Sequence, residues 1–200
     1  MALALIIFSF VMGSLPLAVW LGRTGLKKDI RTYGDHNPGA FNVLRAGGFL
    51  WGGLAIILEI TKGALPVGLA AGQFGIDGWG LVACAIAPII GHAFSPFLNF
   101  RGGKALAVTF GVWIGLTIWP LPLIILLMLV LWYLIVTVSG WAVMFTFAGV
   151  GVYLGLTQAP WEHFAVFWLN LAVIIYRHRA DLAQPIRLRL PPPLLKLLRP

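Results

Sequence analysis

The sequence predicts an all-α integral membrane protein with seven transmembrane helices, and three observations predict this class. Hydrophobic residues make up 60% of the 200-residue chain and charged residues only 10%, whereas soluble domains contain about 45–50% and 25%. The mean hydropathy of +0.94 excludes a soluble domain or a disordered chain, because too few polar side chains are present. The basic residues, which give a net charge of +8, flank long apolar runs, and this distribution indicates a membrane protein rather than a nucleic-acid-binding one.

The first helix is predicted over residues 1–21, which carry no charged side chain. A secretory signal would have a basic start, a shorter apolar core and a cleavage site of small residues, and this segment has none of these. We therefore expect an uncleaved helix. The second and third helices are predicted over residues 49–73 and 78–98, since a span needs about 20 apolar residues.

Residues 105–176 are almost wholly apolar, and three breaks divide them into four further helices. The breaks are Trp119-Pro120-Leu121-Pro122, Ser139-Gly140 and Gln158-Ala159-Pro160, where proline cannot donate to a helix and glycine weakens one. The predicted helices are 105–118, 123–138, 141–157 and 161–176. Several are short for a lipid-exposed span and would need bilayer thinning or longer neighbours, so five crossings are the alternative if the short ones are re-entrant.

The lysines and arginines predict the orientation. All of them except Lys62 lie in residues 22–48, 99–104 and 177–200. Cytoplasmic loops carry such an excess of positive charge, so these three segments are expected inside, with the N-terminus outside and the C-terminus cytoplasmic. Residues 1–186 form the predicted membrane domain. Residues 187–200 are a basic tail rich in leucine and proline, which we expect to lie against anionic headgroups.

Two loops have the composition of an anion site. Residues 33–48 are rich in glycine and asparagine and include Arg45, so backbone N–H groups and a guanidinium can face an anion. Arg101-Gly102-Gly103-Lys104 stands directly before a predicted helix, and a tight turn, two cations and a helix N-terminus are the ingredients of a phosphate site. The alternatives are a turn-rich loop whose arginine binds lipid headgroups and a basic anchor at the inner face.

Other polar residues are candidates with structural alternatives. Glu59 and Lys62 are three residues apart, so they can pair within the membrane as a functional or a structural pair. Residues 177–181 combine Arg177, His178 and Asp181 at the end of the last helix, where a basic collar is the alternative. His92 is a candidate ligand or a packing residue, and Ser14 can bond to its own helix.

Some patterns are absent from the sequence. The lone Cys84 can form neither an internal disulfide nor a zinc site, and it is interpreted as a packing residue. The chain has no Gly-x-Ser-x-Gly elbow and no His-Glu-x-x-His motif. With only six carboxylate side chains, a two-metal site is not expected, and no metal is predicted.

Five ordered segments together resemble the bacterial acyl-phosphate:glycerol-3-phosphate acyltransferases of the PlsY type. They resemble the opening Gly-Ser-hydrophobic-Pro of that family, its Gly- and Asn-rich loop ending in Arg, its Asp-x-x-Lys-Gly-x-x-Pro, its Gly-His segment ending in Lys-Gly-Gly-Lys, and its final Arg-His. In this chain they are Gly13–Pro16, residues 34–45, Glu59–Gly63 with Pro66, residues 91–104, and Arg177-His178.

The resemblance implies a seven-helix fold with a cytoplasm-facing site in the bacterial inner membrane. It implies transfer of a fatty acyl group from acyl phosphate to the 1-hydroxyl of glycerol 3-phosphate, giving lysophosphatidic acid and phosphate for phospholipid biosynthesis. No cofactor, metal or acyl carrier is implied. The expected partners are the two substrates, membrane lipids and the enzyme that supplies acyl phosphate.

The resemblance also assigns roles to residues. Activated acyl phosphate needs positioning and oxyanion stabilisation rather than a covalent enzyme intermediate. His92, His178 and Asp181 are the catalytic candidates, with the substrate's own phosphate as the alternative base. The expected substrate and phosphate ligands are Ser14, Asn37, Asn42, Arg45, Arg101, Gly102, Gly103, Lys104 and Arg177.

The chain departs from the family pattern near the expected anion site. Asp35 replaces Ser, His36 replaces Gly, Phe41 replaces Thr, Ala105 replaces Gly, and Asp181 replaces Asn. A carboxylate repels phosphate unless it is neutralised, so Asp35 is expected to pair with His36 or Arg45, or to point away. These departures leave two alternatives open, a divergent member with another phosphorylated substrate and a non-catalytic lipid- or anion-binding protein. A small transporter or membrane scaffold is the third.

Overall fold

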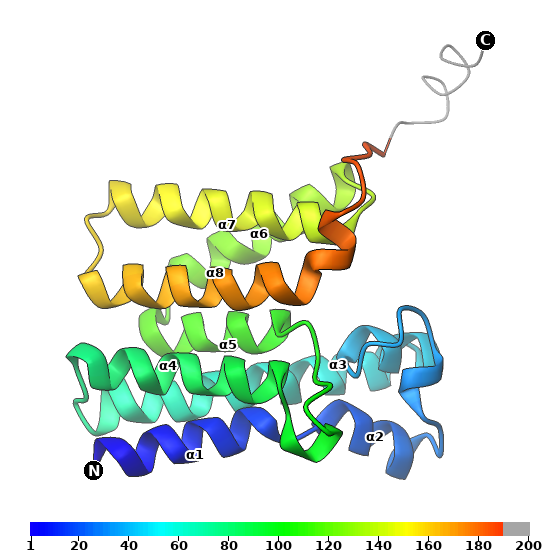
Figure 1. The fold of residues 1–200 in the computed structure, drawn as a ribbon, viewed down its shortest axis with the longest axis horizontal. Helices are drawn as coiled ribbons and strands as arrows, with labels where there is room; N and C mark the ends of the chain where they lie inside the picture. The colour runs from blue at the N-terminus through cyan, green and yellow to red at the C-terminus, as the bar shows by residue number, and fades with distance from the viewer. Residues whose placement is uncertain (190–200) are drawn as a thin grey trace.

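The computed structural model describes residues 1–189, and these residues form eight α-helices (Figure 1). Two 3₁₀ turns, Ile30–Thr32 and Pro96–Leu98, and one π-helical turn, Leu69–Gln73, lie between them. The last residues of the predicted basic tail, 190–200, lie outside the described residues. The helices are α1 Ala2–Ser14, α2 Leu17–Gly25, α3 Ala40–Gly68, α4 Gly78–Ala93, α5 Leu106–Thr117, α6 Leu121–Ile135, α7 Ser139–Leu156 and α8 Trp161–Leu182.

The helices lie side by side along the long axis of the molecule, and they alternate in direction when α1 and α2, which run the same way, are taken as one bent segment (Figure 1). The N-terminus and the α3–α4 and α7–α8 connections lie at one end, and the α2–α3 and α6–α7 connections lie at the other. The second end holds the segments rich in lysine and arginine. This separation is the one that the charge pattern predicts for a membrane protein.

Membrane-span candidates are found where the hydropathy predicts them. Within residues 1–189, three helical segments are long and apolar enough to span a bilayer, Ala40–Gln73, Gly78–Leu98 and Ser139–Leu156. The α1–α2 pair passes as a fourth, bent by 41°. The shorter α5 and α6 cover the predicted helices 105–118 and 123–138, and α8 covers 161–176. With α1 and α2 taken together, each of the seven predicted segments therefore corresponds to a helix.

Several helix boundaries differ from the prediction. For example, α8 continues to Leu182 rather than ending at residue 176, and two differences are larger. Residues 1–21 form two helices, because Pro16 has no N–H to donate and holds Leu15 in an extended conformation, with φ −60° and ψ 122°. The helix expected to begin at residue 49 begins at Ala40 instead, and it bends at Gly48, where φ is +80°. Only glycine adopts that angle readily, so the extra helical turns lie at an angle to the rest of α3.

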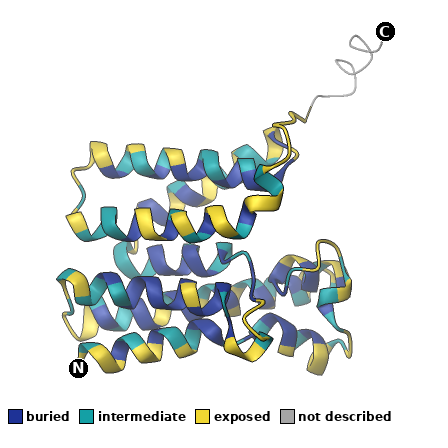
Figure 2. Cartoon of the chain, in the orientation of Figure 1, coloured by how far each residue is buried: buried dark blue, intermediate teal, exposed yellow. Residues whose placement is uncertain are grey.

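Small residues allow the helices to approach closely. A Cβ atom at Gly13 would collide with the backbone of Pro88, and one at Gly63 would collide with the carbonyl of Val108. These contacts pack α1 on α4 and α3 on α5, as small residues do between membrane helices. Large apolar side chains that are exposed, such as Leu127 and Trp168, lie on the outward faces, which Figure 2 shows in yellow around a buried interior.

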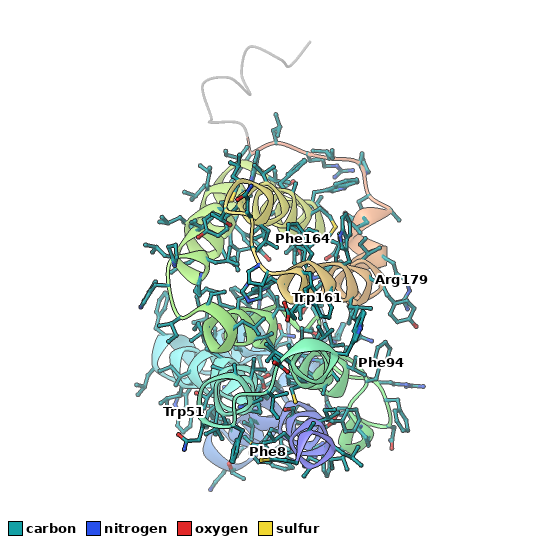
Figure 3. The ribbon with its side chains drawn as sticks, turned by 90° about the vertical axis from the view of Figure 1, so that its left-hand side faces the viewer. Phe8, Trp51, Phe94, Trp161, Phe164 and Arg179 are labelled. Carbon is teal, nitrogen blue, oxygen red and sulfur yellow. The ribbon has the colours of Figure 1, made fainter. Side chains whose placement is uncertain are left out.

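Aromatic side chains contact one another near both ends of the molecule, for example Trp20 with Phe97 at the basic end and Trp79 with Trp161 at the other. Trp79 and Trp161 make an edge-to-face contact with ring centroids 5.0 Å apart. Figure 3, which looks along the helices from this end, shows Trp161 at the start of α8 and Phe8 on the outer side of α1. Tryptophan is enriched at the membrane–water interface, so this contact is placed where the lipid headgroups are expected.

Candidate active site

The loop before α3 folds back onto the first turns of that helix. Gly34 has a φ of +57°, and a Cβ atom there would collide with the guanidinium of Arg45 and the amide of Asn42. The Asn42 amide donates to Asp35 Oδ1 at 3.1 Å and to the Asn37 carbonyl at 2.8 Å. Arg45 Nη1 donates to Asn42 Oδ1 at 2.8 Å. The first loop therefore has a defined shape in which Arg45 and Asp35 lie next to each other.

The Gly-Gly turn before α5 is held against the end of α4. A Cβ atom at Gly102 would collide with the carbonyl of His92, and one at Gly103 would collide with its imidazole ring. The backbone N–H of Gly103 donates to the His92 carbonyl at 3.1 Å, and the N–H of Lys104 donates to Asn37 Oδ1 at 3.1 Å. The turn, which belongs to the second predicted anion loop, therefore contacts the first loop and places Lys104 next to it.

Lys104 is the centre of the candidate site. Its Nζ atom lies 3.0 Å from Asp35 Oδ2 and 3.0 Å from Asp181 Oδ2. The same oxygen of Asp181 accepts from Ser139 Oγ at 2.9 Å and lies 3.1 Å from His178 Nδ1. Three regions that are far apart in the sequence, the first loop, the Gly-Gly turn and the end of α8, therefore meet at one ammonium group, and the start of α7 reaches them through Asp181.

Burial and ion pairing act in opposite directions on these charges. Burial works to lower the pKa of Lys104, but its hydrogen bonds to Asp181 and Asp35 outweigh burial and raise that pKa above its usual value. Burial likewise works to raise the pKa of Asp35, but the hydrogen bond and charge of Lys104 lower it overall. Both groups are therefore ionised at neutral pH, and Lys104 remains a cation.

The site opens toward solvent on the side of the first loop. The side chains of Arg45 and Asp35 are 53% and 44% exposed, whereas that of Lys104 is 24% exposed. Arg177 closes the other side, where its Nη2 donates to the Gly102 carbonyl. An anion that approaches from solvent therefore meets Arg45 first and Lys104 behind it.

The expectation for Asp35 is confirmed only in part. The expected contact with Arg45 is present, with Arg45 Nη1 3.8 Å from Asp35 Oδ1, but the nearest cation is Lys104. His36 does not pair with it, because His36 Nδ1 lies 2.9 Å from the carbonyl of Arg31 instead. The first loop and the Gly-Gly turn lie side by side in the fold, and this proximity is not visible in the spacing of the residues.

A second polar cluster lies deeper, between α3 and α4. Glu59 Oε2 lies 2.8 Å from Lys62 Nζ and 3.0 Å from His92 Nδ1, and all three side chains are buried. The predicted Glu59–Lys62 pair therefore forms, and His92 is its third member. Ser14 is nearby and buried, but its Oγ donates to the carbonyl of Phe10 in its own helix.

The structure separates the predicted site residues into groups. Arg101 is exposed and makes no side-chain hydrogen bond or ion pair within residues 1–189. Ser14, His92, Glu59 and Lys62 belong to the buried cluster. The residues that gather around Lys104 are Asn37, Asn42, Arg45, Gly102, Gly103, Arg177, His178 and Asp181.

Ser139 is a site residue that the sequence reasoning missed. Its hydroxyl contacts Asp181 from the first turn of α7. In the sequence, Ser139-Gly140 indicates only a break between two helices, and no motif surrounds it. The sequence indicates Ser139 only as a hydroxyl side chain at the basic end of a mainly apolar helix.

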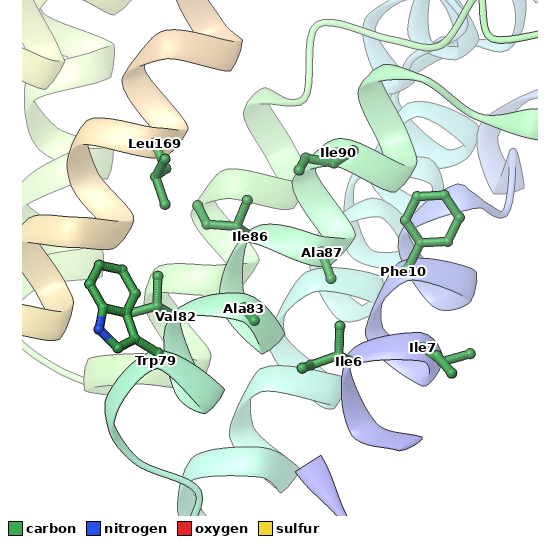
Figure 4. Close-up of a pocket in the computed structure, with 10 residues that line it drawn as sticks. All are labelled: Ile6, Ile7, Phe10, Trp79, Val82, Ala83, Ile86, Ala87, Ile90 and Leu169. Carbon is green, nitrogen blue, oxygen red and sulfur yellow. The ribbon is translucent and has the colours of Figure 1, made fainter. Parts of the chain in front are cut away.

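A separate apolar groove of about 540 Å³ runs between α1, α4 and α8 (Figure 4). Apolar side chains line it, from Trp79 near the start of α4 to Ile90 and Phe10 near the buried cluster. Within the described residues, no three or more His, Cys, Asp or Glu side chains are grouped so that they could hold a metal ion.

The fold and the site define a class of protein. A helical membrane protein with a lysine, an arginine and a glycine turn at one end of its bundle has the features of an enzyme that handles anionic lipid precursors. The chain matches the profile of the family described as glycerol-3-phosphate acyltransferase over residues 3–187, and it belongs to this family. The resemblance seen in the motifs is therefore confirmed, and the chain is a membrane-bound glycerol-3-phosphate acyltransferase.

Individual relatives cover nearly the whole chain. It is 37% identical to glycerol-3-phosphate acyltransferase 1 of Deinococcus radiodurans over 90% of both chains. It is 37% identical to the glycerol-3-phosphate acyltransferase of Thiobacillus denitrificans, over 90% of this chain and 91% of the relative.

Two solved structures have the same fold. The integral membrane glycerol 3-phosphate acyltransferase PlsY (YgiH), in its glycerol 3-phosphate form, superposes with a TM-score of 0.80 at 30% identity over 99% of each chain. The lysophosphatidic acid form of that protein superposes with a TM-score of 0.79 at 30% identity, over 91% of this chain and 90% of the other. The predicted all-α membrane fold is therefore confirmed.

Proposed function

We propose that this chain transfers a fatty acyl group from acyl phosphate to the 1-hydroxyl of glycerol 3-phosphate at the Lys104 site. The products are lysophosphatidic acid and inorganic phosphate. The observation that carries this proposal is the convergence of Lys104, Arg45 and the Gly102-Gly103 turn at one solvent-facing point. The related PlsY structures, solved in glycerol 3-phosphate and lysophosphatidic acid forms, support the same acceptor and product.

The cations bind and orient the two phosphate groups. Arg45 can fork onto phosphate oxygens, while Lys104 supplies a point charge. The Gly-Gly turn packs closely against His92, because neither glycine has a side chain, and this packing holds Lys104 beside the first loop. Holding two anionic substrates together turns a bimolecular reaction into an effectively unimolecular one. A cation near the acyl carbonyl also stabilises the oxyanion that forms when the hydroxyl attacks.

The leaving phosphate is the proposed proton acceptor. The hydroxyl oxygen of the acceptor bonds to the acyl carbon, the bond from that carbon to the phosphate oxygen breaks, and the hydroxyl proton passes to the departing phosphate. His178 does not suit this role, because it is only 2% exposed and its Nε2 is buried. His178 and Ser139 instead position Asp181, and Asp181 positions Lys104. His92 supports the Gly-Gly turn from α4.

The proposal also assigns a binding groove to the acyl chain and an orientation to the protein in the membrane. The groove between α1, α4 and α8 has an almost wholly apolar lining and ends near the polar end of the bundle, so it suits a fatty acyl chain. The basic end of the molecule is proposed to face the cytoplasm of a bacterial inner membrane. The enzyme that makes acyl phosphate is the proposed partner that supplies the donor.

Transfer in liposomes tests this function. Purified protein would receive palmitoyl phosphate and labelled glycerol 3-phosphate, and the wild type is expected to form labelled lysophosphatidic acid. Lys104→Ala is expected to lower the rate by roughly 10²-fold or more, the size seen when one stabilising donor is removed. Lys27→Ala is the control, because it removes a positive charge from an exposed side chain at the same end of the molecule but outside the two predicted anion loops. It is expected to lower the rate less than about threefold.

Two results would contradict the proposal. Folded wild-type protein that forms no labelled product would exclude this reaction. Equal losses for Lys104→Ala and Lys27→Ala would show that Lys104 contributes only general positive charge.

A further inference from the structure

The carboxylate of Asp35 bridges the two cations of the proposed phosphate site. Its Oδ2 atom lies 3.0 Å from Lys104 Nζ, and its Oδ1 atom lies 3.8 Å from Arg45 Nη1. A phosphate group bound by the same two side chains would place two of its oxygens in similar positions. In this structure Asp35 therefore occupies the position that a phosphate would take.

Asp181, the other carboxylate at Lys104, differs in its surroundings. It lies at the end of α8 with a side chain only 20% exposed, and Ser139 and His178 also hold it. Asp35 lies on a loop, its side chain is 44% exposed, and its other side-chain contacts are to Asn42 and the backbone of Asn37. An incoming anion therefore displaces Asp35 more easily than Asp181.

We propose that Asp35 is a specificity-determining residue, a built-in competitor that the acceptor's phosphate must displace from Lys104 and Arg45. The inference rests on the proposed function, because it assigns the acceptor phosphate to these two cations. Once displaced, Asp35 remains tethered within a few ångströms of the phosphate and repels it. Asp35 therefore lowers the preference of the site for doubly charged phosphate monoesters over singly charged phosphodiesters.

The size of the effect follows from the charge of the ligand. At a separation of about 6 Å in water, one unit of like charge lowers a binding constant by a factor of about three, and two units lower it by about ten. Glycerol 3-phosphate is mostly a dianion above pH 7, because the second phosphate pKa is near 6. The methyl phosphodiester of glycerol 3-phosphate carries a single negative charge throughout this pH range.

Equilibrium binding to the full-length protein in detergent tests the proposal. The ligands are glycerol 3-phosphate and its methyl phosphodiester, measured at pH 7.5 and about 0.05 M salt. Asp35→Asn keeps the shape of the side chain and removes its charge. It is expected to raise the affinity for glycerol 3-phosphate about tenfold and that for the diester about threefold. Both gains are expected to shrink at about 0.5 M salt, because salt screens exposed charges.

Two further variants complete the design. Asp35→Ser is the second substitution, because a hydroxyl can still accept from Asn42 if the amide of the first variant disturbs the loop. Asp77→Asn removes the same charge from the connection before α4, at the other end of the molecule, and is expected to change neither affinity. It therefore controls for net charge.

The outcomes separate this inference from the proposed function. Unchanged affinities in both Asp35 variants, or equal gains for the dianion and the monoanion, would overturn the inference while transfer in liposomes stood. A gain with Asp35→Ser alone would also overturn it, because the added hydroxyl rather than the lost charge would then be responsible. If no variant binds glycerol 3-phosphate and the wild type transfers no acyl group, the proposed function falls as well.

Discussion

Ala105 lies in a backbone conformation that suits glycine. Its φ is +61°, in the left-handed region, and its side chain is buried directly before α5. A residue with a Cβ atom is destabilised there by about 1–2 kcal/mol. The family pattern has glycine at this position, and the conformation gives the physical reason. The departure therefore changes the strain in the turn after Lys104 and leaves the proposed phosphate ligands in place.

Replacing Ala105 with glycine tests this strain. Ala105→Gly is expected to cost about 2–3 kcal/mol less stability than Ala85→Gly, because the first substitution relieves a left-handed alanine, worth about 1–2 kcal/mol, and the second weakens a helix by about 1 kcal/mol. Ala85 is the matched control, since it is equally buried but lies within α4. Thermal unfolding in detergent gives the comparison. Equal losses of stability at the two positions would contradict the strain at residue 105.

At the scale of helices, the break between α1 and α2 is stabilised from α3. The break at Pro16 leaves the Leu15 carbonyl and the Ala18 N–H without the partners of a continuous helix. Lys62 Nζ donates to the Leu15 carbonyl at 2.8 Å, and Glu59 Oε1 accepts from the Ala18 N–H at 3.2 Å. The buried ion pair therefore satisfies backbone groups in an apolar region, where water is scarce.

Neutralising one member of this pair should destabilise the protein strongly. Glu59→Gln leaves Lys62 buried without a counter-charge, and breaking a buried pair in this way costs about 3–5 kcal/mol. Glu162→Gln, which removes a carboxylate in the first turn of α8, is the control and should cost less than about 1 kcal/mol. Thermal unfolding and the yield of folded protein are the measurements. Equal stability of the two variants would show that the Glu59–Lys62 pair contributes nothing to the free energy of unfolding.

At the scale of the whole molecule, the alternating helices place the basic loops at one end and the N-terminus at the other (Figure 1). This arrangement is the one that seven crossings would require, and it makes the sidedness of each connection testable. Gln73, Gln158 and Gln184 are exposed residues in or beside connections. The first two lie at the end of the N-terminus and the third lies at the basic end.

Cysteine labelling in intact cells tests this topology. In a Cys84→Ala background, which removes the single native thiol, Gln73→Cys and Gln158→Cys are expected to react with an impermeant reagent added outside. Gln184→Cys should react only after the cells are opened, because positively charged segments stay in the cytoplasm. Labelling of Gln184→Cys from outside, or protection of either other position, would exclude the seven-helix scheme.

The helical segments, their breaks and the basic end follow from the order of residues alone. Hydropathy, proline positions and charge act over a few neighbouring residues, so 78–98 and 161–176 could be identified without a structure. The Gly-Gly turn and the Glu59–Lys62 pair were visible for the same reason.

Other features depend on tertiary packing. Asp35 and Asp181 meet at Lys104 only because the first loop, the Gly-Gly turn and the end of α8 converge, and Ser139 reaches Asp181 from α7. His92 joins Glu59 rather than Lys104 because α4 packs beside α3. Distances between residues far apart in the sequence are set by how helices pack, and no local pattern encodes them.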